Sequence, residues 1–342
     1  MVSIYDIAKE VGVSASTVSL VLNGKGKKMR ISRETEKLIL ETAKRMGYIP
    51  NMSARKLRAN KARHIPEIAL CWSPTQHSLF LNTFINVLQN MISSGEVREM
   101  RFMILPYKNG ELEKLESVIS TNYFNGIVVP PVLKEDIEFL EKTNIQVPVI
   151  MLYGDIPQYN LVSVDNYKVG EEIAGIFHRH GHNTVGIMQS IEMRPTISVE
   201  QRKESFLKSC QDFKMEVKEI SSGLPAPILN KVEEGKIAAQ KMIEENNFPT
   251  ALFIQNDVLA LGALSVFAEH GINIPEDMEI IVYGVNDLLE IHNPPITSVS
   301  YPTEEISREC ILVIDNALNN PGTRPVRKII DMTYVFRESC LY

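Results

Sequence analysis

The stretch SIYDIAKEVGVSASTVSLVLNGKG, Ser3 to Gly26, predicts two short helices joined by a glycine turn. Ser3 and Asp6 have the spacing of a capping box, and apolar residues recur at helical intervals until Gly12, which favours a helix end. Ser14 can cap a second helix, and the Asn-Gly pair that follows eight residues of helix would end it.

The second helix is expected to turn a small, polar face outward. Val18, Val21 and Leu22 form its apolar side. The residues left on the outward side are Ala15, Ser16, Ser19 and Leu20. Because bulky side chains would block the approach to base edges, this face suits a helix that lies in the major groove of DNA. A generic helical hairpin is the alternative, since short helices joined by glycine are common.

A third helix follows Ser32, with Glu34 near the positive end of its dipole. The side chains expected to point inward are Leu38, Ile39, Ala43 and Met46. Gly47 ends this helix, and Pro50 prevents its resumption. The next segment, Asn51 to Arg58, has room for about two helical turns, too few to be stable alone in water. We therefore expect it to be disordered until something holds it.

Charge is divided unevenly along the chain. Residues 1–63 hold 14 Lys or Arg against 5 Asp or Glu, a net charge of +9. The whole chain has 36 against 42, so the other residues hold 22 against 37, a net charge of −15. The cations that flank the second helix and the segment after Pro50 are Lys25, Lys27, Lys28, Arg30, Arg55, Lys56 and Arg58. Attraction to phosphates explains this placement better than a solvated charge run does.

The chain resembles the LacI/GalR (lactose repressor/galactose repressor) family of bacterial transcriptional regulators over nearly its whole length. The motifs stand in family order: YDIAKEVGVSASTVSLVLNGKG, RISRETEKLILETAKRMGYIPN, ARKLR, VSVDNYKVGEEIAGIFHRHGHNTVGIM, QRKESF, FIQNDVLALGALSVFAEHGINIPEDMEIIVYGVND, NPPITSVS and FRES. The resemblance implies a homodimer, with a tetramer as the open alternative, that binds a pseudo-palindromic double-stranded DNA operator and a small-molecule effector. It also implies a hinge helix at residues 51–60 that enters the minor groove.

The resemblance carries DNA contacts onto particular positions. The residues it implies as phosphate contacts are Tyr5, Ser14, Thr17, Ser19, Asn23, Ser32, Tyr48 and Asn51. Ala15 and Ser16 occupy the pair of positions that reads bases, and Ala54 and Leu57 lie in the hinge. Leu57 of each subunit would wedge between base pairs, and such wedges kink DNA by roughly 20 to 90°.

Two features of this head depart from the family pattern. Leu20 stands where many relatives carry an Arg that grips a guanine, and the loss of such a bidentate contact removes roughly 1 to 3 kcal/mol of discrimination. We therefore expect a different base pair at that operator position. Lys27 to Met29 lengthen the loop before the third helix. They add phosphate contacts or simply a longer surface loop, and the sequence leaves both open.

The rest of the chain alternates apolar strand patterns with amphipathic helix patterns, which predicts parallel sheets. The first series of strands is Ile68–Cys71, Phe102–Leu105, Gly126–Val129 and Val149–Leu152, with helices between them such as Leu81–Ser93. The second series is Leu161–Val164, Val185–Met188, Val217–Ile220, Ala251–Ile254 and Glu279–Val282. The fold class we predict is an all-α helix-turn-helix head followed by an α/β core of two doubly wound parallel-sheet lobes.

The resemblance implies that these lobes are like those of type I periplasmic binding proteins, with crossings near residues 160, 285 and 325. The predicted domains are a head at 1–50, a hinge helix at 51–60, a linker at 61–66 and a core at 67–342 for effector binding and dimerisation. The N-lobe is expected at about 67–160 and 300–325, and the C-lobe at about 161–299 and 326–342.

Ligands of open parallel sheets bind beyond the carboxyl ends of the strands, so two facing lobes predict a cleft. The residues predicted to bind the effector are His77, Phe80, Tyr107, Asp165, Arg202, Asn256 and Asn286. Arg202 offers a fork of donors and Asp165 accepts from hydroxyls, which suits a sugar or sugar derivative. Asp257 after Asn256 has helix capping as an equally good interpretation, and Trp72 is expected to pack rather than to serve as a sugar platform.

The effector itself stays open at this point. Asn286 replaces an acidic residue common in sugar-responsive relatives, and Ser205 replaces a common Gly. Purines act on some members of the family and a phosphorylated carrier protein on one branch, so both remain alternatives. Whether the effector releases or promotes DNA binding is not determined by the sequence.

Enzymes and metalloproteins lack support in the sequence. We find no G-x-S-x-G, G-x-x-x-x-G-K-[ST], G-x-G-x-x-G after a strand or H-E-x-x-H motif, and expect neither an enzyme nor a cofactor. The alternating His178, His180 and His182 suggest a metal, but a helix end is the role we expect, so no metal site is predicted. The cysteines Cys71, Cys210, Cys310 and Cys340 show no paired spacing and indicate reduced thiols.

The start of the chain lacks the pattern of a secretory signal, and no stretch reaches the roughly 18 apolar residues that span a bilayer. We therefore expect a bacterial cytoplasmic, nucleoid-associated protein without a membrane partner. An exported sugar receptor is the less favoured alternative, since it would need neither a basic head nor DNA.

The basic head generates the first testable prediction. The logarithm of the DNA-binding constant should fall linearly with the logarithm of the salt concentration, with a slope of about −0.9 for each phosphate neutralised. Fluorescence anisotropy with a labelled duplex at a series of salt concentrations measures this slope. A salt-independent binding constant would contradict the role given to the head.

Overall fold

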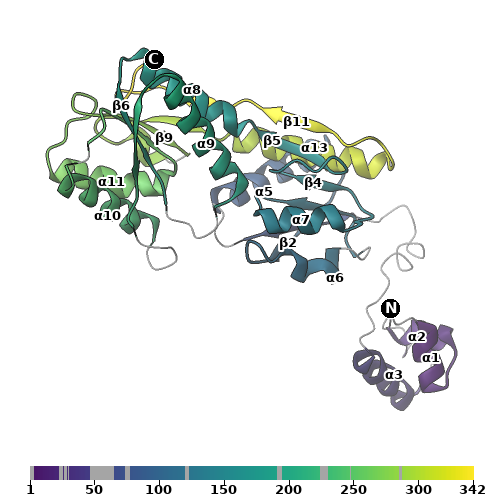
Figure 1. The fold of residues 1–342 in the computed structure, drawn as a ribbon. Helices are drawn as coiled ribbons and strands as arrows, with labels where there is room; N and C mark the ends of the chain where they lie inside the picture. Colours follow the sequence, from purple (N-terminus) through teal and green to yellow (C-terminus); the bar gives the residue numbers. More distant parts are fainter. Residues whose placement is uncertain are drawn as a thin grey trace. The chain divides into compact units, whose positions relative to one another are not determined.

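The computed structural model describes residues 4–22, 26, 29, 31–46, 65–73, 78–119, 123–190, 195–223, 230–246, 248–284 and 287–342. The chain divides into two compact units, Met1–His64 and Ile65–Tyr342, and we describe each by itself (Figure 1). Among the helices of the described ranges, none has the length and apolar character needed to cross a membrane.

The first unit is built from three helices, α1 (Ile4–Val11), α2 (Ala15–Leu22) and α3 (Arg33–Arg45). They enclose a small core of buried side chains, which consists of Ile7, Ala8, Val18, Val21, Ile39 and Ala43. Gly12 ends α1 with a φ of 74°, a left-handed conformation that glycine adopts without strain. The three predicted helices are therefore confirmed, and so are the helix end at Gly12 and the caps at Ser14 and Ser32. The other predicted helix ends, at Ser3, at Asn23 and Gly24, and at Gly47, lie outside the described residues.

One predicted core residue of the first unit lies elsewhere. Leu38 is 49% exposed, while Ile39, Thr42 and Ala43 are buried. The inward stripe of α3 follows the spacing of three and four residues from Ile39, and a neighbour one position away is turned about 100° from that stripe. The expectation that Leu38 points inward was wrong for this reason.

The second unit contains two six-stranded sheets. The strands of the first sheet are β1 (Glu67–Trp72), β2 (Arg101–Pro106), β3 (Gly126–Val129), β4 (Val149–Met151), β5 (Asn160–Val164) and β11 (Arg327–Ile330), in the order β11-β5-β4-β3-β1-β2. All of their pairings are parallel. Helices α5 (Ser78–Ser93) and α13 (Thr303–Asn319) cover one face. The other face carries η2 (Leu112–Leu115), α6 (Glu116–Ile119) and α7 (Lys134–Lys142).

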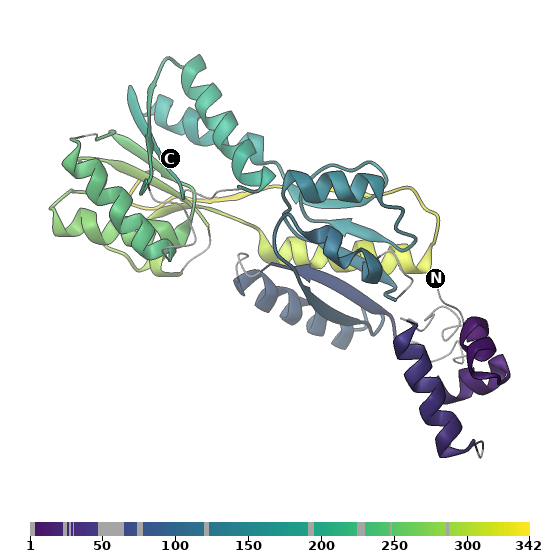
Figure 2. The same cartoon turned by 60° about the horizontal axis from the view of Figure 1, so that its bottom comes forward.

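The strands of the second sheet are β6 (Thr184–Met188), β7 (Glu216–Ile220), β8 (Ala251–Ile254), β9 (Glu279–Tyr283), β10 (Thr297–Ser300) and β12 (Thr333–Val335), in the order β12-β10-β9-β8-β6-β7. Only the β10–β12 pairing is antiparallel among these strands. Helices α8 (Asn166–Arg179) and α9 (Ile197–Asp212) lie on one face, and α10 (Lys231–Glu244) and α11 (Asp257–Glu269) on the other (Figures 1 and 2). A short helix, α12 (Asp287–Glu290), follows β9.

Both sheets are buried on two faces, and their strands show why. In β8, Leu252 and Ile254 pack under α10 and α11, whereas Ala251 and Phe253 pack under α8 and α9. Successive side chains of a strand point to opposite faces, so a sheet covered on both sides needs continuous apolar strands. The predicted pair of doubly wound lobes is confirmed by this layering.

The assignment of strands to lobes needs a correction. Residues 161–164 were predicted in the second series, but β5 pairs with β4 and β11 in the first sheet. The chain passes between the sheets after β5, after β10 and after β11, that is at residues 165, 301–302 and 331–332 rather than near 160, 285 and 325. Hydrophobic periodicity shows that a segment is a strand, but it does not show which sheet the strand joins.

A close contact between α8 and α9 fixes one wall of the second lobe. A Cβ atom on Gly170 would lie 2.3 Å from the carbonyl oxygen of Arg202 and 2.6 Å from the backbone nitrogen of Phe206. Because both are backbone atoms, neither can move aside without shifting a helix. The absence of a side chain on Gly170 also leaves room for Ser205, because a Cβ on Gly170 would lie 2.0 Å from its Oγ.

We predict that Gly170→Ala lowers the free energy of unfolding by about 1 to 3 kcal/mol, because the added methyl group overpacks the helix contact. Gly175→Ala is the matched control in the same helix, since a Cβ there would meet only the Arg179 side chain at 3.4 Å. The control should be neutral or stabilising, because Gly is a poor helix residue. Urea unfolding of both variants measures the difference, and equal stabilities would argue against a close contact.

Candidate nucleic-acid interface and effector cleft

The N-terminal end of α2 is formed by Ser14, whose Oγ accepts a hydrogen bond from the backbone N–H of Thr17 at 3.1 Å. The two hydroxyl groups lie 2.8 Å apart. Ser14 is thus an N-cap, and the remaining free N–H groups of the first turn point out of the helix end, where they suit a phosphate. Ser16, in the first turn, is exposed, and its neighbour Ala15 is half-buried.

Some of the other residues predicted to contact DNA lie within the described part of the head, and the rest lie outside it. Tyr5 is 71% exposed on α1, and Ser32 caps α3 by accepting from the backbone N–H of Thr35 at 3.1 Å. Ser19 and Leu20 are half-buried on α2. The predicted contacts that lie outside the described residues are Asn23, Tyr48, Asn51, Ala54 and Leu57. The lysines of the lengthened loop, Lys27 and Lys28, also lie outside them.

The core holds a cleft of about 540 Å³ with residues from both sheets in its wall. Trp72 is the last residue of β1 and Tyr153 follows β4 in the first lobe, while Gln255 follows β8 and Tyr283 ends β9 in the second. Parallel strands that end at one edge bring such residues together. The cleft therefore lies at the carboxyl edges of the two sheets, as predicted.

Aromatic rings line one side of the cleft in two stacked pairs. The ring centroids of Trp72 and Phe80 lie 5.8 Å apart at 15°, and those of Tyr153 and Tyr301 lie 5.9 Å apart at 19°. Burial raises the pKa of Tyr153 and of Tyr301 well above the ordinary value, so both hydroxyl groups stay protonated at neutral pH. The wall thus offers apolar ring faces together with hydroxyl donors. Trp72, expected only to pack, does both: it packs against the first lobe's core and faces the cleft.

Arg202 is a buried cation in the cleft wall. It is 4% exposed, its Nη1 donates to Asn166 Oδ1 at 2.7 Å, and its guanidinium carbon lies 3.8 Å from the ring centroid of Tyr283. Its buried Nε has no hydrogen-bond partner within the described residues, and neither has the side-chain amide of Gln255. No carboxylate of those residues forms an ion pair with Arg202. Buried polar groups without partners are costly unless a ligand or water completes them.

The predicted effector residues are only partly brought together. Phe80, Arg202 and Asn256 line the cleft, and Asn256 also caps α11 by accepting from the backbone N–H of Leu259 at 2.9 Å. Asp165 instead caps α8, accepts from the backbone N–H of Lys168 at 3.0 Å, and lines a different cavity with Asp331. His77 and Asn286 lie outside the described residues.

Tyr107 also lies away from the cleft wall. It is buried in the core of the first lobe beneath η2 and α6, on the same face as Leu105. The backbone N–H of Tyr107 donates to Trp72 O at 3.0 Å, so the ladder of β2 continues past its last residue. Alternation of side chains along that extension sends residue 107 into the core. Neither Tyr107 nor Asp165 therefore lines the cleft.

Sequence reasoning missed several cleft residues. Gln255 and Tyr283 stand at the ends of predicted strands, so the rule of carboxyl edges was sufficient to nominate them. Tyr301 follows β10, a short strand that the polar sequence TSVS concealed. Asn166 is buried and orients Arg202, and no local pattern marks it for that role. Asp257 was not missed, since the sequence named it with helix capping as an equally good interpretation. It is buried in the cleft wall, and its Oδ1 accepts from the backbone N–H of Val258 at 2.8 Å.

Comparisons with known proteins agree with both units. Residues 3–51 match the family described as bacterial regulatory proteins, lacI family, and residues 174–340 match the periplasmic binding protein-like domain. The chain is 28% identical to the probable HTH-type transcriptional repressor ExuR of Bacillus subtilis, over 99% of this chain and 98% of that protein. It is 25% identical to the HTH-type transcriptional repressor PurR of Pasteurella multocida, over 97% and 96%.

Solved structures show the same architecture. A LacI family transcription regulator from Clostridium acetobutylicum superimposes with a TM-score of 0.70 at 27% identity, over 80% of this chain and 99% of that one. The lac repressor dimer bound to operator and the anti-inducer ONPF shares the fold with a TM-score of 0.67 at 17% identity, over 100% and 99%.

A helix-turn-helix head and a two-lobed core define the class of DNA-binding transcriptional regulators with a periplasmic-binding-protein-like domain. Within that class, the chain belongs to the LacI family of bacterial regulatory proteins.

The N-terminal end of α2 generates a prediction that distinguishes the helix-capping role of Ser14 from the base-reading role of Ser16. Ser14→Ala removes the N-cap and should lower the free energy of unfolding of the head by about 1 kcal/mol, and also weaken binding to all duplexes. Ser16→Ala, the matched control, should leave stability unchanged because Ser16 is exposed, and should alter only the preference at one base pair. Thermal melting and a randomised-duplex selection measure the two effects. Identical behaviour of both variants would contradict the assignment.

Proposed function

We propose that this protein is a transcriptional repressor whose operator affinity is set by a small molecule, a sugar or sugar derivative, bound in the cleft. The observation that carries the proposal is the buried Arg202, whose Nε has no partner among the described residues. It lines the same cleft as the aromatic pairs and the Gln255 amide, which also lacks a partner among those residues. Donors and acceptors beside flat apolar faces suit a ring that carries hydroxyl groups. Relatives named as regulators also support a regulatory rather than an enzymatic role.

The cleft gives a physical route from ligand to DNA. A ligand that contacts Trp72 and Tyr153 in one lobe and Arg202 and Gln255 in the other binds most tightly at one relative orientation of the lobes. Operator affinity then changes only as far as the ligand distinguishes the two orientations. In the dimer that we propose, this orientation changes the spacing of the two heads on the operator.

Purine control is the second candidate, because the stacked aromatic pairs also suit a planar base. The chain is similar to proteins named as PurR repressors and, at 26% identity, to catabolite control protein A of Priestia megaterium. Control by a phosphorylated carrier protein would act on the surface of the core rather than inside the cleft. A ligand screen therefore distinguishes these candidates.

The direct test of this function begins with selection of genomic fragments by the purified full chain. The selected duplex is then titrated in the presence of neutral sugars, sugar acids and purines, one compound at a time. We expect one class of compound to change the binding constant for the selected duplex. Absence of any preferred duplex would contradict the repressor role, and a preferred duplex that responds only to purines would favour the second candidate.

Arg202→Met is predicted to weaken binding of the active compound by about 10- to 100-fold, because a charge-assisted hydrogen bond contributes about 1.5 to 3 kcal/mol. Arg179→Met is the matched control, since the Arg179 guanidinium also lies near a tyrosine ring, 6.0 Å from the centroid of Tyr342, but away from the cleft. Isothermal titration calorimetry measures both. Equal affinities for the two variants would remove Arg202 from the site.

A further inference from the structure

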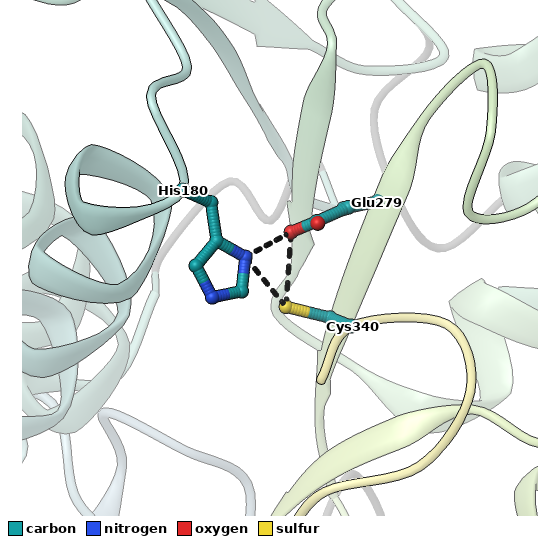
Figure 3. Close-up of side chains that lie close together, drawn as sticks. All are labelled: His180, Glu279 and Cys340. Atoms are coloured by element: carbon teal, nitrogen blue, oxygen red, sulfur yellow. Dashed lines mark hydrogen bonds and ion pairs between the residues drawn. The ribbon is translucent and has the colours of Figure 1, made fainter. Parts of the chain in front are cut away.

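Four side chains that could bind a metal ion converge at the amino edge of the second sheet, opposite the edge that forms the cleft. They are His180 at the end of α8, His182 before β6, Glu279 at the start of β9 and Cys340 near the C-terminus. Glu279 Oε2 is the meeting point: His180 Nδ1 lies 2.7 Å from it, His182 Nε2 3.2 Å and Cys340 Sγ 3.2 Å. Figure 3 shows three of these side chains pointing toward one another from separate elements.

The hydrogen bonds around His182 fix where its proton lies. The single hydroxyl proton of Thr250 is donated to Thr184 O at 3.0 Å, so Thr250 Oγ1 accepts from His182 Nδ1 at 2.9 Å. In the neutral ring Nε2 then carries a lone pair. That lone pair faces a carboxylate oxygen, and the buried Nε2 has no hydrogen-bond partner in the described part of the chain. Two lone pairs held this close require a positive charge between them, from either a proton or a metal ion.

The types of donor favour zinc. A thiolate, imidazole nitrogens and a carboxylate are the ligands of tetrahedral Zn²⁺ sites, with bonds of about 2.0 to 2.3 Å. Such bonds place neighbouring ligand atoms roughly 3.3 to 3.7 Å apart. The observed separations run from 2.7 Å between His180 Nδ1 and Glu279 Oε2 to 4.0 Å between His180 Nδ1 and Cys340 Sγ. These values belong to His180, Glu279 and Cys340, whose ligand atoms already lie within 4.8 Å of one another. His182 approaches this trio at Glu279 Oε2, and its ring has to rotate further than the other side chains to complete a tetrahedron.

Charge balance also favours a divalent cation. Glu279 is an ordinary carboxylate at neutral pH: its Oε2 accepts from the Cys340 thiol at 3.2 Å and lies 2.7 Å from His180 Nδ1. The Cys340 thiol donates to this carboxylate, and a bound cation would replace that proton and leave a thiolate ligand. One Zn²⁺ with one thiolate, one carboxylate and two neutral imidazoles has zero net charge. A neutral set is the least costly one to hold in a partly buried site.

We propose that His180, His182, Glu279 and Cys340 bind one Zn²⁺ in a closed, structural site. The side chains of His180, His182 and Glu279 are 21%, 14% and 20% exposed, which leaves a path from solvent, while Cys340 is buried. With four protein ligands no position is left for a substrate. The ion fastens the C-terminal segment to α8 and β9. The alternating histidines alone did not support a metal, because the other two ligands are 99 and 160 residues away from His180.

The test uses the full chain without an affinity tag, freed of metal with a chelator. Zn²⁺ is titrated in competition with a chromophoric chelator, and Co²⁺ is bound as a spectroscopic probe. We expect one equivalent of Zn²⁺ and, with Co²⁺, a thiolate charge-transfer band with the strong ligand-field absorption of a tetrahedral site. Cys340→Ala should weaken Zn²⁺ binding at least a hundredfold and remove the charge-transfer band.

Cys210→Ala is the matched control, because Cys210 is also a buried thiol of the second lobe but lies outside the cluster. It should keep the affinity and the spectrum of the original chain. Zn²⁺ should raise the melting temperature of the original chain and of Cys210→Ala, but not of Cys340→Ala or of His182→Gln. No Zn²⁺ binding against the competitor, or equal binding by Cys340→Ala and Cys210→Ala, would overturn the proposal and leave a network held by protons alone.

Discussion

The contact between α8 and α9 at Gly170 is the constraint on which the cleft depends. Because no side chain separates the two backbones there, Asn166 on α8 reaches Arg202 on α9 at 2.7 Å and orients its guanidinium over Tyr283. Burial of that charge without an ion pair among the described residues is costly. The helix contact thus holds a strong hydrogen-bond donor in place before any ligand arrives. Binding then causes a smaller loss of conformational entropy.

Local sequence signals predicted local structure well. Ser14, Gly12 and Ser32 marked the helix ends of the head, since caps act within one turn, and β3 and β8 were bounded correctly because apolar runs flanked by polar residues define buried strands. The residues that failed depended on something beyond the local pattern. Leu38 is exposed although its neighbour Ile39 is buried, because one residue along a helix turns the side chain away from the core. Tyr107 points into the core because a hydrogen bond to Trp72 of β1 extends the pairing of β2 past its last residue.

The site was less predictable than the fold because its residues meet only through topology. Arg202 is in the middle of α9, Tyr301 follows a strand of mixed polarity, and Asn166 looks like any residue in a first helical turn. The rule that ligands bind beyond strand ends selects positions but not side-chain directions. Asp165 shows the difference: it follows β5 as the rule requires, yet its carboxylate is used to cap α8 beside another cavity.

The two edges of the second sheet differ in how their polar groups are hydrogen-bonded. The carboxyl edge holds buried polar atoms without partners in the described part of the chain, whereas the amino edge is fastened by the C-terminal segment. Thr297 N–H donates to Ser339 Oγ at 2.8 Å, Thr297 Oγ1 donates to Cys340 O at 2.7 Å, and Ser339 Oγ donates to Ile280 O at 2.8 Å. These bonds hold Cys340 without a metal, so an ion at His180 and Glu279 would stiffen an existing attachment rather than create it. The C-terminal segment reaches the second sheet from β11 through the crossing at residues 331–332. Because its attachment to the amino edge is firm, a change in the relative orientation of the lobes has to take place at the crossings.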